Sequence, residues 1–338
     1  MAAEGPWFLE IFSGTAKLTD AVKEKGIRCL PPIDITVCAS VPIPFDVVDV
    51  DLWQFIMQLI LLGAIWFAHF STPCNTYSAA RKEGDGGPPP LRSAEFPDGL
   101  PGLADDHQHQ VFLGNIFRDR TCEACSALAF MGFHFSVENP LGSLIWATPK
   151  VKELLVWSRG LFVDLDQCFF GAPSKKPTRL LVSHQIFQSL LAKACPGNHK
   201  HVVLKGKVFS HQFGRVVYRT KLAQVYPAAM CSAMASAIRS LWEDPLQWFQ
   251  ASFELVGSVH DRKRPVGQAI AWKDHKQQQS ALAAVASGYQ LKRGALKPLL
   301  DVETEPGTAI KWVLSIPHPF SVDPAVDPHL LNAIHQVA

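Results

Sequence analysis

The sequence has little net charge, no long apolar run and no dense cysteine pattern. Its 338 residues carry 32 Lys and Arg against 30 Asp and Glu, which gives a formal net charge of +2. A protein that binds nucleic acid only by tracking phosphates has a stronger basic bias, so we expect any nucleic-acid contact to be local. Eight cysteines in a chain of this length are typical of reduced thiols inside a cell rather than of a secreted disulfide scaffold.

Targeting and membrane-spanning patterns are also missing. The N-terminus runs into the segment PWFLEIF without the pattern of a signal peptide, so we predict an intracellular protein of the nucleus or cytoplasm. The most apolar segment, 55–70, is shorter than the about 20 residues of a membrane span, and Gln58 and His69 interrupt it. Gly63 divides this segment into the end of a helix and a buried strand. We therefore expect no contact with a membrane.

Short apolar segments alternate with helical ones over the first two-thirds of the chain. The predicted strands cover 7–12, 27–35, 64–70, 133–140, 160–168 and 178–183, and the predicted helices cover about 16–25, 51–63 and 106–131. Strands separated by helices indicate βαβ units, so we predict an α/β fold with a mostly parallel sheet. Beyond 240 this alternation stops, and we expect a small C-terminal appendage over 241–338.

Parallel sheets bind ligands at the carboxyl ends of their strands, so these ends hold the candidate functional residues. The first strand leads into 13–15, Ser-Gly-Thr, a turn whose backbone N–H groups could receive a polar ligand or simply form an ordinary βα turn. The second ends at Asp34, where an acid can accept hydrogen bonds from ribose hydroxyls. Asp46 and Asp49 precede the next helix. An acid there can instead complement the helix N-terminus, which is the interpretation we prefer for Asp51.

The next two strand ends carry a thiol and a carboxylate. The third strand is followed by Pro73 and Cys74, and a cysteine in such a crevice can have a lowered pKa and act as an attacking thiolate. Most isolated cysteines are small buried hydrophobes, which is the alternative for Cys74. The fourth strand ends in Glu138 and Asn139, at the same edge of the sheet. Two reactive groups at neighbouring strand ends favour a catalytic site.

In this order the motifs resemble those of the DNA cytosine-5 methyltransferases, which use S-adenosylmethionine. FLEIFSGTAKL is similar to their cofactor turn, STPCNTYS to their Pro-Cys loop and SVENP to their Glu-Asn motif. FFGAPSKKPTRLL occupies the place of their basic motif, and VYPAAMCSAMASAI that of their closing helix. The resemblance covers about 7–240 and is closer to divergent members found in phage and in mobile-element polyproteins of algae. It implies a Rossmann-like S-adenosylmethionine-dependent methyltransferase fold over 1–240.

The resemblance also implies roles for individual residues. Cys74 would be the nucleophile and Glu138 the acid that holds N3 of the base, with Lys176 and Arg179 contacting the base or the backbone. The residues implied to bind the cofactor are Phe12, Ser13, Gly14, Thr15, Asp34, Asp46, Asp49 and Pro73. Those implied to bind the substrate are Asn75, Ser78, Arg81, Lys82, Asn139 and Lys175. A solvated basic turn is the alternative for Lys175, Lys176 and Arg179.

The chemistry explains why a thiol and an acid are needed together. C5 of cytosine becomes nucleophilic only after a thiolate adds to C6, and general-acid help at N3 is worth roughly 10²–10⁴-fold. The base must be flipped out of a duplex or arrive single-stranded. We therefore expect a cytosine methyltransferase acting on DNA. The alternatives are the same chemistry on RNA or single strands, or a catalytically silent nucleic-acid-binding domain of a mobile-element polyprotein.

Three features depart from the family pattern. The Glu-Asn motif continues with Pro140, and the closing motif has no Gly-Asn pair, so Tyr226 and Pro227 would shape the cofactor wall. The recognition region, 182–224, is short, which suggests low sequence specificity or reliance on the appendage.

Two groups of cysteines raise the question of a metal. Four residues form a weak zinc candidate with irregular spacing, whose alternative is a set of loop histidines near nucleic acid: Cys168, Cys195, His199 and His201. Cys122 and Cys125 form a CxxC pair on a predicted helix with no second pair. We interpret that pair as helix packing.

Overall fold

The computed structural model describes residues 6–243, apart from positions 37, 39, 42, 43, 85, 86 and 211–213, so the predicted appendage beyond 243 lies outside the described residues. Its central sheet has the strand order β1 (Trp7–Ile11), β2 (Ile65–Phe70), β3 (His134–Pro140), β5 (Pro177–Val182) and β4 (Leu161–Asp166). β1, β2 and β3 are parallel, and β5 is antiparallel to both β3 and β4. All strands except β5 therefore run in one direction. This confirms the α/β class with a mostly parallel sheet, which is compatible with a Rossmann-like fold.

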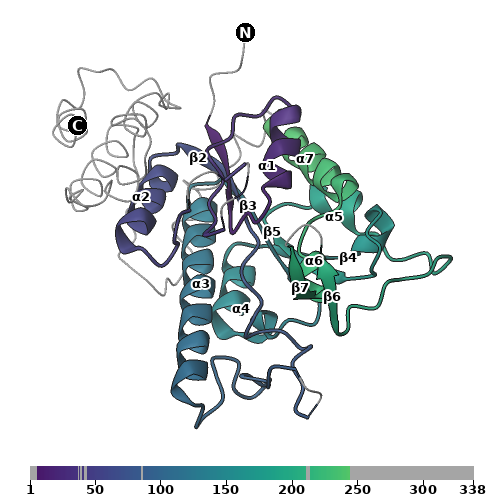
Figure 1. Ribbon diagram of the computed structural model, residues 1–338. Coiled ribbons are helices and arrows are strands. Elements are labelled where there is room, and N and C mark those ends of the chain that lie inside the picture. The colour runs from purple at the N-terminus through teal and green to yellow at the C-terminus, as the bar shows by residue number, and fades with distance from the viewer. Residues whose placement is uncertain are drawn as a thin grey trace, which may run out of the picture.

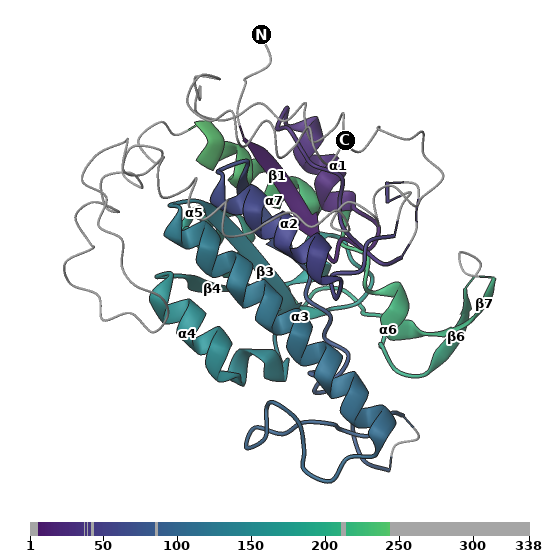
Figure 2. The same ribbon diagram turned by 90° about the vertical axis from the view of Figure 1, so that its left-hand side faces the viewer.

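Helices cover both faces of this sheet (Figure 1, Figure 2). One face carries α2 (Val50–Leu61), α3 (Asp105–Phe130) and α4 (Pro149–Trp157), and the other carries α1 (Lys17–Glu24), α5 (Ile186–Leu191) and α7 (Ala228–Glu243). Because both faces are covered, every residue of β2 is buried. Ile65 and Phe70 pack in the core with α2 and α3, whereas Trp66 and Phe67 pack in the core with α1 and α7.

The strand order reverses between β1 and β2. After α1 the chain returns to the outer edge of β1, where Phe8 bridges Cys29 and Ile11 bridges Ile33, both in parallel. It then crosses through α2 to reach β2 on the opposite side of β1. Such a switch point opens a crevice at the carboxyl ends of the two strands, which is where α/β sheets bind ligands.

The predicted strand at 27–35 was wrong in extent, because the structure has only these isolated bridges there. The reason is the adjacent pair Pro31 and Pro32, which have no N–H groups to donate to a ladder.

Several short elements were not predicted from the sequence. They are η1 (Leu144–Ala147), α4, η2 (Gln167–Phe170), α5, β6 (Lys207–Ser210), β7 (Arg215–Tyr218) and α6 (Arg219–Leu222). The predicted recognition region, 182–224, holds α5, the antiparallel β6–β7 hairpin and α6. Figure 2 shows this hairpin standing out from the body of the molecule.

The apolar segment 55–70 divides as expected. α2 ends at Leu61, Gly63 adopts a positive φ of 74°, and β2 begins at Ile65. Within the described part of the chain, none of the helices combines the length and the apolar character that a membrane crossing needs.

Candidate functional site

The turn after β1 brings three of the predicted cofactor residues together. The Gly14 N–H donates to Oδ2 of Asp34 at 2.7 Å, and the Ser13 N–H donates to the Ile33 carbonyl at 3.1 Å. Gly14 has a φ of 55°, and apart from its two chain neighbours none of the described residues has an atom within 4 Å of the place where a Cβ would be. Within the described part of the chain, this face of the turn is therefore not covered by packed side chains. Phe12, also at positive φ, packs its ring edge-on to Phe117, and Thr15 is half-buried on the same turn.

Asp46 and Asp49 are each engaged by the local backbone. Oδ1 of Asp49 accepts from the Leu52 N–H at 2.8 Å and caps α2. Oδ1 of Asp46 accepts from the Val48 N–H at 2.9 Å. These bonds are those of a helix cap and a turn. That these two acids bind the cofactor stays a prediction.

The segment after β2 is tied to both neighbouring strands. The Ser71 N–H donates to the Ile11 carbonyl at the end of β1 at 3.1 Å. Nδ2 of Asn139, at the end of β3, donates to the Thr72 carbonyl at 2.7 Å, and Asn139 is fully buried. Pro73 and Cys74 follow directly. The carboxyl ends of β1, β2 and β3 are therefore held at one edge, with Cys74 beside them.

Cys74, Glu138, Lys176 and Arg81 lie within electrostatic reach of one another. Burial raises the pKa of the Cys74 thiol, the charge of Glu138 raises it further, and the charges of Lys176 and Arg81 lower it. Cys74 therefore lies close enough to Glu138 for the carboxylate charge to act on the thiol. The predicted lowering of the Cys74 pKa was wrong, because the loss of hydration and the charge of Glu138 outweigh the charges of Lys176 and Arg81.

Glu138 and Asn139 present acceptor atoms that the described protein residues do not satisfy. Oε1 of Glu138 lies 3.7 Å from Nζ of Lys176 but has no hydrogen-bond partner among the described residues. The same is true of Oδ1 of Asn139 and of the hydroxyl of Ser13. Buried polar atoms are seldom left without partners. Three of them at this sheet edge indicate a place for a polar ligand.

Lys176 reaches the site from the turn between η2 and β5. Its backbone has a φ of 35°, in a region that residues other than glycine rarely adopt. Its Nζ lies 5.7 Å from the centre of the Tyr226 ring. The Tyr226 hydroxyl bonds to Oγ of Ser71 at 2.7 Å and to Nε2 of His69 at 3.2 Å. Burial raises the pKa of Tyr226 well above its usual value and lowers that of His69 to about 3. The segment before α7 thus closes this side of the site with neutral groups.

The loop after Cys74 is held by its own arginines. Arg81 donates through Nε to the Asn75 carbonyl at 2.8 Å and through Nη1 to the Pro89 carbonyl at 3.1 Å. Oγ of Ser78 accepts from the Ala80 N–H at 3.2 Å. The exposed side chains of Asn75 and Lys82 lie at either end of this loop.

Arg92, which was not predicted from the sequence, is the buried anchor of this loop. Its guanidinium stacks 3.7 Å from the centre of the Tyr77 ring and donates to Oγ1 of Thr76 at 3.0 Å. It sits in a Pro-rich segment without periodicity, so no local signal in the sequence marks it.

Arg179 and Lys175 do not join the cluster around Cys74. In the register of β5, Arg179 stands opposite Asn139 and Asp164, while its neighbour Leu180 stands opposite Glu138. Alternate residues face opposite sides of a sheet, so Arg179 faces away from Glu138. It forms a two-pronged pair with Asp164, at 2.6 and 2.7 Å. The structure therefore does not support the predicted contact of Arg179 with a base.

Lys175 points elsewhere as well, because its Nζ lies 3.6 Å from Oδ2 of Asp166. About half of its side chain is exposed, so a contact with a backbone phosphate stays a prediction.

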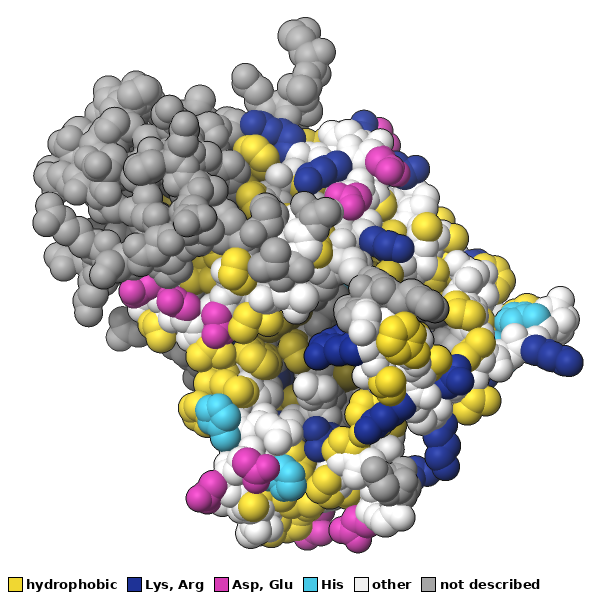
Figure 3. Space-filling model, in the orientation of Figure 1, with side chains coloured by type: hydrophobic (Ala, Val, Ile, Leu, Met, Phe, Trp, Pro, Cys, Tyr) yellow, Lys and Arg dark blue, Asp and Glu magenta, His cyan; other side chains and the backbone are white. Residues whose placement is uncertain are grey.

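The β6–β7 hairpin carries basic and aromatic side chains on its surface. Nζ of Lys207 lies 5.0 Å from the centre of the Tyr218 ring. Phe209, Val216 and Tyr218 are exposed. Figure 3 shows Lys and Arg side chains gathered on the side of the molecule that carries this hairpin, and a hollow between that side and α3.

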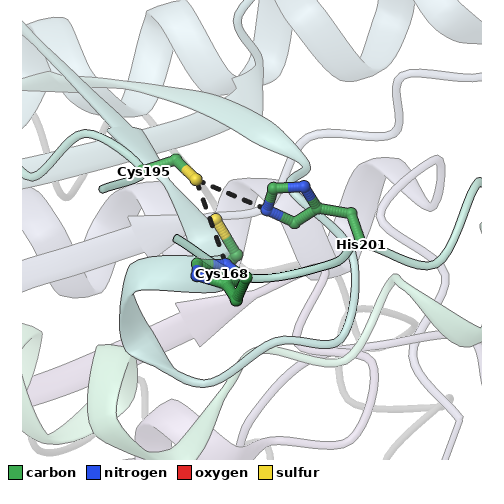
Figure 4. Close-up of side chains that lie close together, drawn as sticks. Cys168, Cys195 and His201 are labelled. Carbon is green, nitrogen blue, oxygen red and sulfur yellow. Dashed lines mark hydrogen bonds between the residues drawn. The ribbon is translucent and has the colours of Figure 1, made fainter. Parts of the chain in front are cut away.

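The four residues of the zinc candidate converge in space. The ligand atoms of Cys168, Cys195, His199 and His201 all lie within 4.8 Å of one another (Figure 4). By contrast, Cys122 is buried in α3, and burial raises its pKa to about 12. This confirms that the CxxC pair packs in a helix.

No protein-family model matches the chain, and no curated protein matches it significantly. The functional conclusion therefore depends on the geometry described above. That geometry places a thiol, a carboxylate and an ammonium group beside an open turn, an arrangement suited to nucleophilic chemistry with acid assistance.

Proposed function

We propose that the chain is a methyltransferase that transfers a methyl group from S-adenosylmethionine to C5 of cytosine in DNA. The observation that carries the proposal is the gathering of Cys74, Glu138 and Lys176 at the strand edge that also holds the Gly14 turn. Cys74 and Glu138 are far apart in the sequence and are brought to one edge because β2 and β3 are parallel neighbours. The mostly parallel sheet with a switch point next to this edge supports a ligand site.

In the proposed reaction the sulfur of Cys74 forms a bond to C6 of the base. Electrons of the ring shift toward N3, where Glu138 holds or supplies a proton, and C5 becomes nucleophilic. After methylation, loss of the C5 proton to solvent would restore the C5–C6 double bond, break the C6–S bond and release the Cys74 thiolate. Lys176 is placed to stabilise negative charge on Glu138 or on the thiolate, because its charge acts on both.

The turn after β1 fits the cofactor. S-adenosylmethionine supplies, when bound, the electrophilic methyl group that C5 takes up. The buried Ser13 hydroxyl, unpaired among the described residues, and the open face of Gly14 would receive its polar groups. Asp34 would hold ribose hydroxyls through its carboxylate. Tyr226 and Pro227 would shape the adjoining wall.

A nucleic-acid substrate is supported by the surface beside the hollow. Aromatic faces together with cations are the combination that binds exposed bases and phosphates. The β6–β7 hairpin offers both, in Tyr218, Phe209 and Lys207. The loop with Asn75, Ser78, Arg81 and Lys82 would cover the flipped nucleotide.

The test is methyl transfer by the purified full chain from labelled S-adenosylmethionine to cytosine-containing DNA duplex, DNA single strand and RNA. We expect labelled DNA, and we expect Cys74→Ser to abolish labelling while the matched variant Cys29→Ser, at a half-buried thiol outside the site, retains it. DNA that contains 5-fluorocytosine should trap a covalent complex with the wild type but not with Cys74→Ser. Equal labelling by Cys74→Ser would refute the mechanism.

Two other outcomes identify the alternatives. Labelling of RNA alone, or of single strands alone, would show that the protein methylates that substrate by the same mechanism. Binding of the cofactor without transfer to any nucleic acid would favour a silent binding domain.

A further inference from the structure

Two cysteines and two histidines converge near the end of β4, outside the proposed active site. Cys168 belongs to η2, and the other three residues belong to the loop after α5. Sγ of Cys195 lies 3.4 Å from Nε2 of His201 and 3.9 Å from Nε2 of His199. Figure 4 shows Cys195 and His201 pointing toward one another with Cys168 beside them. We propose that Cys168, Cys195, His199 and His201 form a structural Zn²⁺ site.

The two sulfur–nitrogen separations at Cys195 are close to those of a tetrahedral zinc ion. Zn–S bonds of about 2.3 Å and Zn–N bonds of about 2.0–2.1 Å place sulfur and nitrogen about 3.6 Å apart in a tetrahedron. The two sulfur–nitrogen distances at Cys195, 3.4 and 3.9 Å, lie on either side of this value. At Cys195 an ion would therefore require shifts of only a few tenths of an ångström, and the four ligand atoms as a set lie within 4.8 Å of one another.

Groups around the cluster orient the ligands as a zinc site requires. Nδ1 of His199 lies 3.2 Å from Oδ1 of Asn198, and a proton donated there leaves Nε2 free to bind a metal. The Gly197 N–H donates to Sγ of Cys195 at 3.4 Å, which stabilises a thiolate. Oδ2 of Asp166 accepts from the Cys195 N–H at 2.8 Å and so fixes the backbone of this ligand. Such outer partners typically hold metal ligands in place.

The ligand set selects zinc and a structural role. Two thiolates and two imidazoles complete a four-coordinate tetrahedron, which leaves no open position for a substrate. Mixed sulfur and nitrogen ligands in this geometry favour zinc over magnesium or calcium, which prefer oxygen. The site does not depend on the proposed function, because none of its ligands belongs to the cluster around Cys74.

The position of the cluster shows what a zinc ion would stabilise. The Cys168 N–H donates to the Lys175 carbonyl and the Gln167 N–H to the Lys176 carbonyl, both at 3.4 Å. Zinc would therefore join the loop after α5 to the same turn that carries Lys176, whose Nζ reaches Glu138. In this way one ion fixes both the start of the recognition region and one wall of the active site.

The test measures the metal content of the full chain, purified with a thiol reductant and without chelator. We expect about one equivalent of zinc per chain, and Co²⁺ exchanged into the site should give the intense visible absorption of tetrahedral thiolate coordination. Cys195→Ser and His199→Ala should lose the metal, whereas the matched variant Cys29→Ser should keep it. His199 is exposed, so its replacement leaves the core intact, which circular dichroism verifies.

Graded variants and proteolysis separate a metal site from a hydrogen-bonded cluster. Asn198→Ala removes an outer partner only, so it should weaken zinc binding by roughly 10- to 100-fold. Addition of chelator to the wild type should open the loop to trypsin at Lys200, and added zinc should restore protection. Cys29→Ser should behave as the wild type in both measurements.

Three results would overturn the proposal. They are a wild-type chain that binds zinc no better than His199→Ala, a Cys168–Cys195 disulfide in the reduced preparation, and an iron–sulfur chromophore in place of zinc. A variant that unfolds is replaced by His201→Ala, with the same expected loss.

Discussion

Glu10, the penultimate residue of β1, is a buried carboxyl group whose ionisation we expect to destabilise the fold. Its Oε2 accepts hydrogen bonds from the N–H and the hydroxyl of Thr19, at 2.7 and 2.5 Å, and so connects β1 to α1 on either side of the candidate cofactor turn. Burial raises the pKa of Glu10 from 4.5 to about 7, since the charged form loses its hydration. Thr19 opposes this effect, and the negative charges of Asp20 and Asp34 add to it.

The magnitude follows from the two pKa values. Between about pH 4.5 and about pH 7 the folded state binds more protons at Glu10 than the unfolded chain, so stability falls as the pH rises. The cost is about 1 kcal/mol near pH 5 and about 3 kcal/mol near pH 8. Glu10→Gln keeps an oxygen for both Thr19 donors and removes the ionisation. We therefore expect the variant to gain about 3 kcal/mol over the wild type near pH 8 and about 1 kcal/mol near pH 5.

The assay is urea unfolding followed by tryptophan fluorescence at several pH values, with the free energy of unfolding compared between the two proteins. Burial lowers the pKa of His69 and His134 to about 3, so both residues add stability as the pH rises toward 6.5. They are present in both proteins, so their effect cancels in the difference. Glu24→Gln, at an exposed position of α1, is the matched control and should show a constant difference. A constant difference for Glu10→Gln as well would refute the reasoning.

Three further predictions concern the candidate active site. Glu138→Gln should lower the pKa of Cys74 and speed its alkylation by iodoacetamide at neutral pH, whereas Lys176→Met should slow this alkylation, because the two charges act on the thiol with opposite sign. Unchanged alkylation rates in both variants would show that neither charge acts on Cys74. Asn139→Ala should lower the free energy of unfolding in urea by about 1–3 kcal/mol, because the buried Thr72 carbonyl loses its hydrogen-bond donor, and it should also reduce methyl transfer. A variant as stable as the wild type would show that the Asn139–Thr72 hydrogen bond is dispensable. Arg179→Met should leave the KM for DNA near the wild-type value, because the Arg179 side chain faces away from Glu138. A large increase in KM would instead support the predicted contact of Arg179 with the base.

The sequence was informative where the pattern was local and strong. The six buried residues of β2 and the long helix α3 were predicted close to their observed limits. The meeting of Cys74 and Glu138 was also predictable, because parallel strands that are neighbours end at the same edge of a sheet. The rule that neighbouring parallel strands end at one edge was therefore enough to predict that these two residues lie on the same side of the molecule.

Other features depend on partners that are distant in the sequence. The antiparallel register of β5 decides that Leu180, and not Arg179, stands opposite Glu138, and a pattern of residues does not specify register between strands. The irregular spacing of Cys168, Cys195, His199 and His201 gave only a weak prediction of a shared site. Cys168 meets the other three residues only because β5, which lies between them in the sequence, folds back along β4. The role of Arg92 depends on its contact with Tyr77, which lies earlier in the same irregular connection between β2 and α3 and which no local pattern links to Arg92.

The raised pKa of Cys74 has a consequence for the proposed catalytic cycle. Burial and the charge of Glu138 both keep the sulfur protonated, while Lys176 and Arg81 favour the thiolate. A cytosine bound with its N3 edge on Glu138 would share a proton with the carboxylate and cancel the second cause of the raised pKa. The thiol would then become nucleophilic mainly when a base is in place, which protects it from other electrophiles, including the methyl donor. If this coupling operates, Glu138→Gln should lower methyl transfer although it makes Cys74 more reactive toward iodoacetamide, and a variant in which both rates rise together would show that the carboxyl has no part in holding the base.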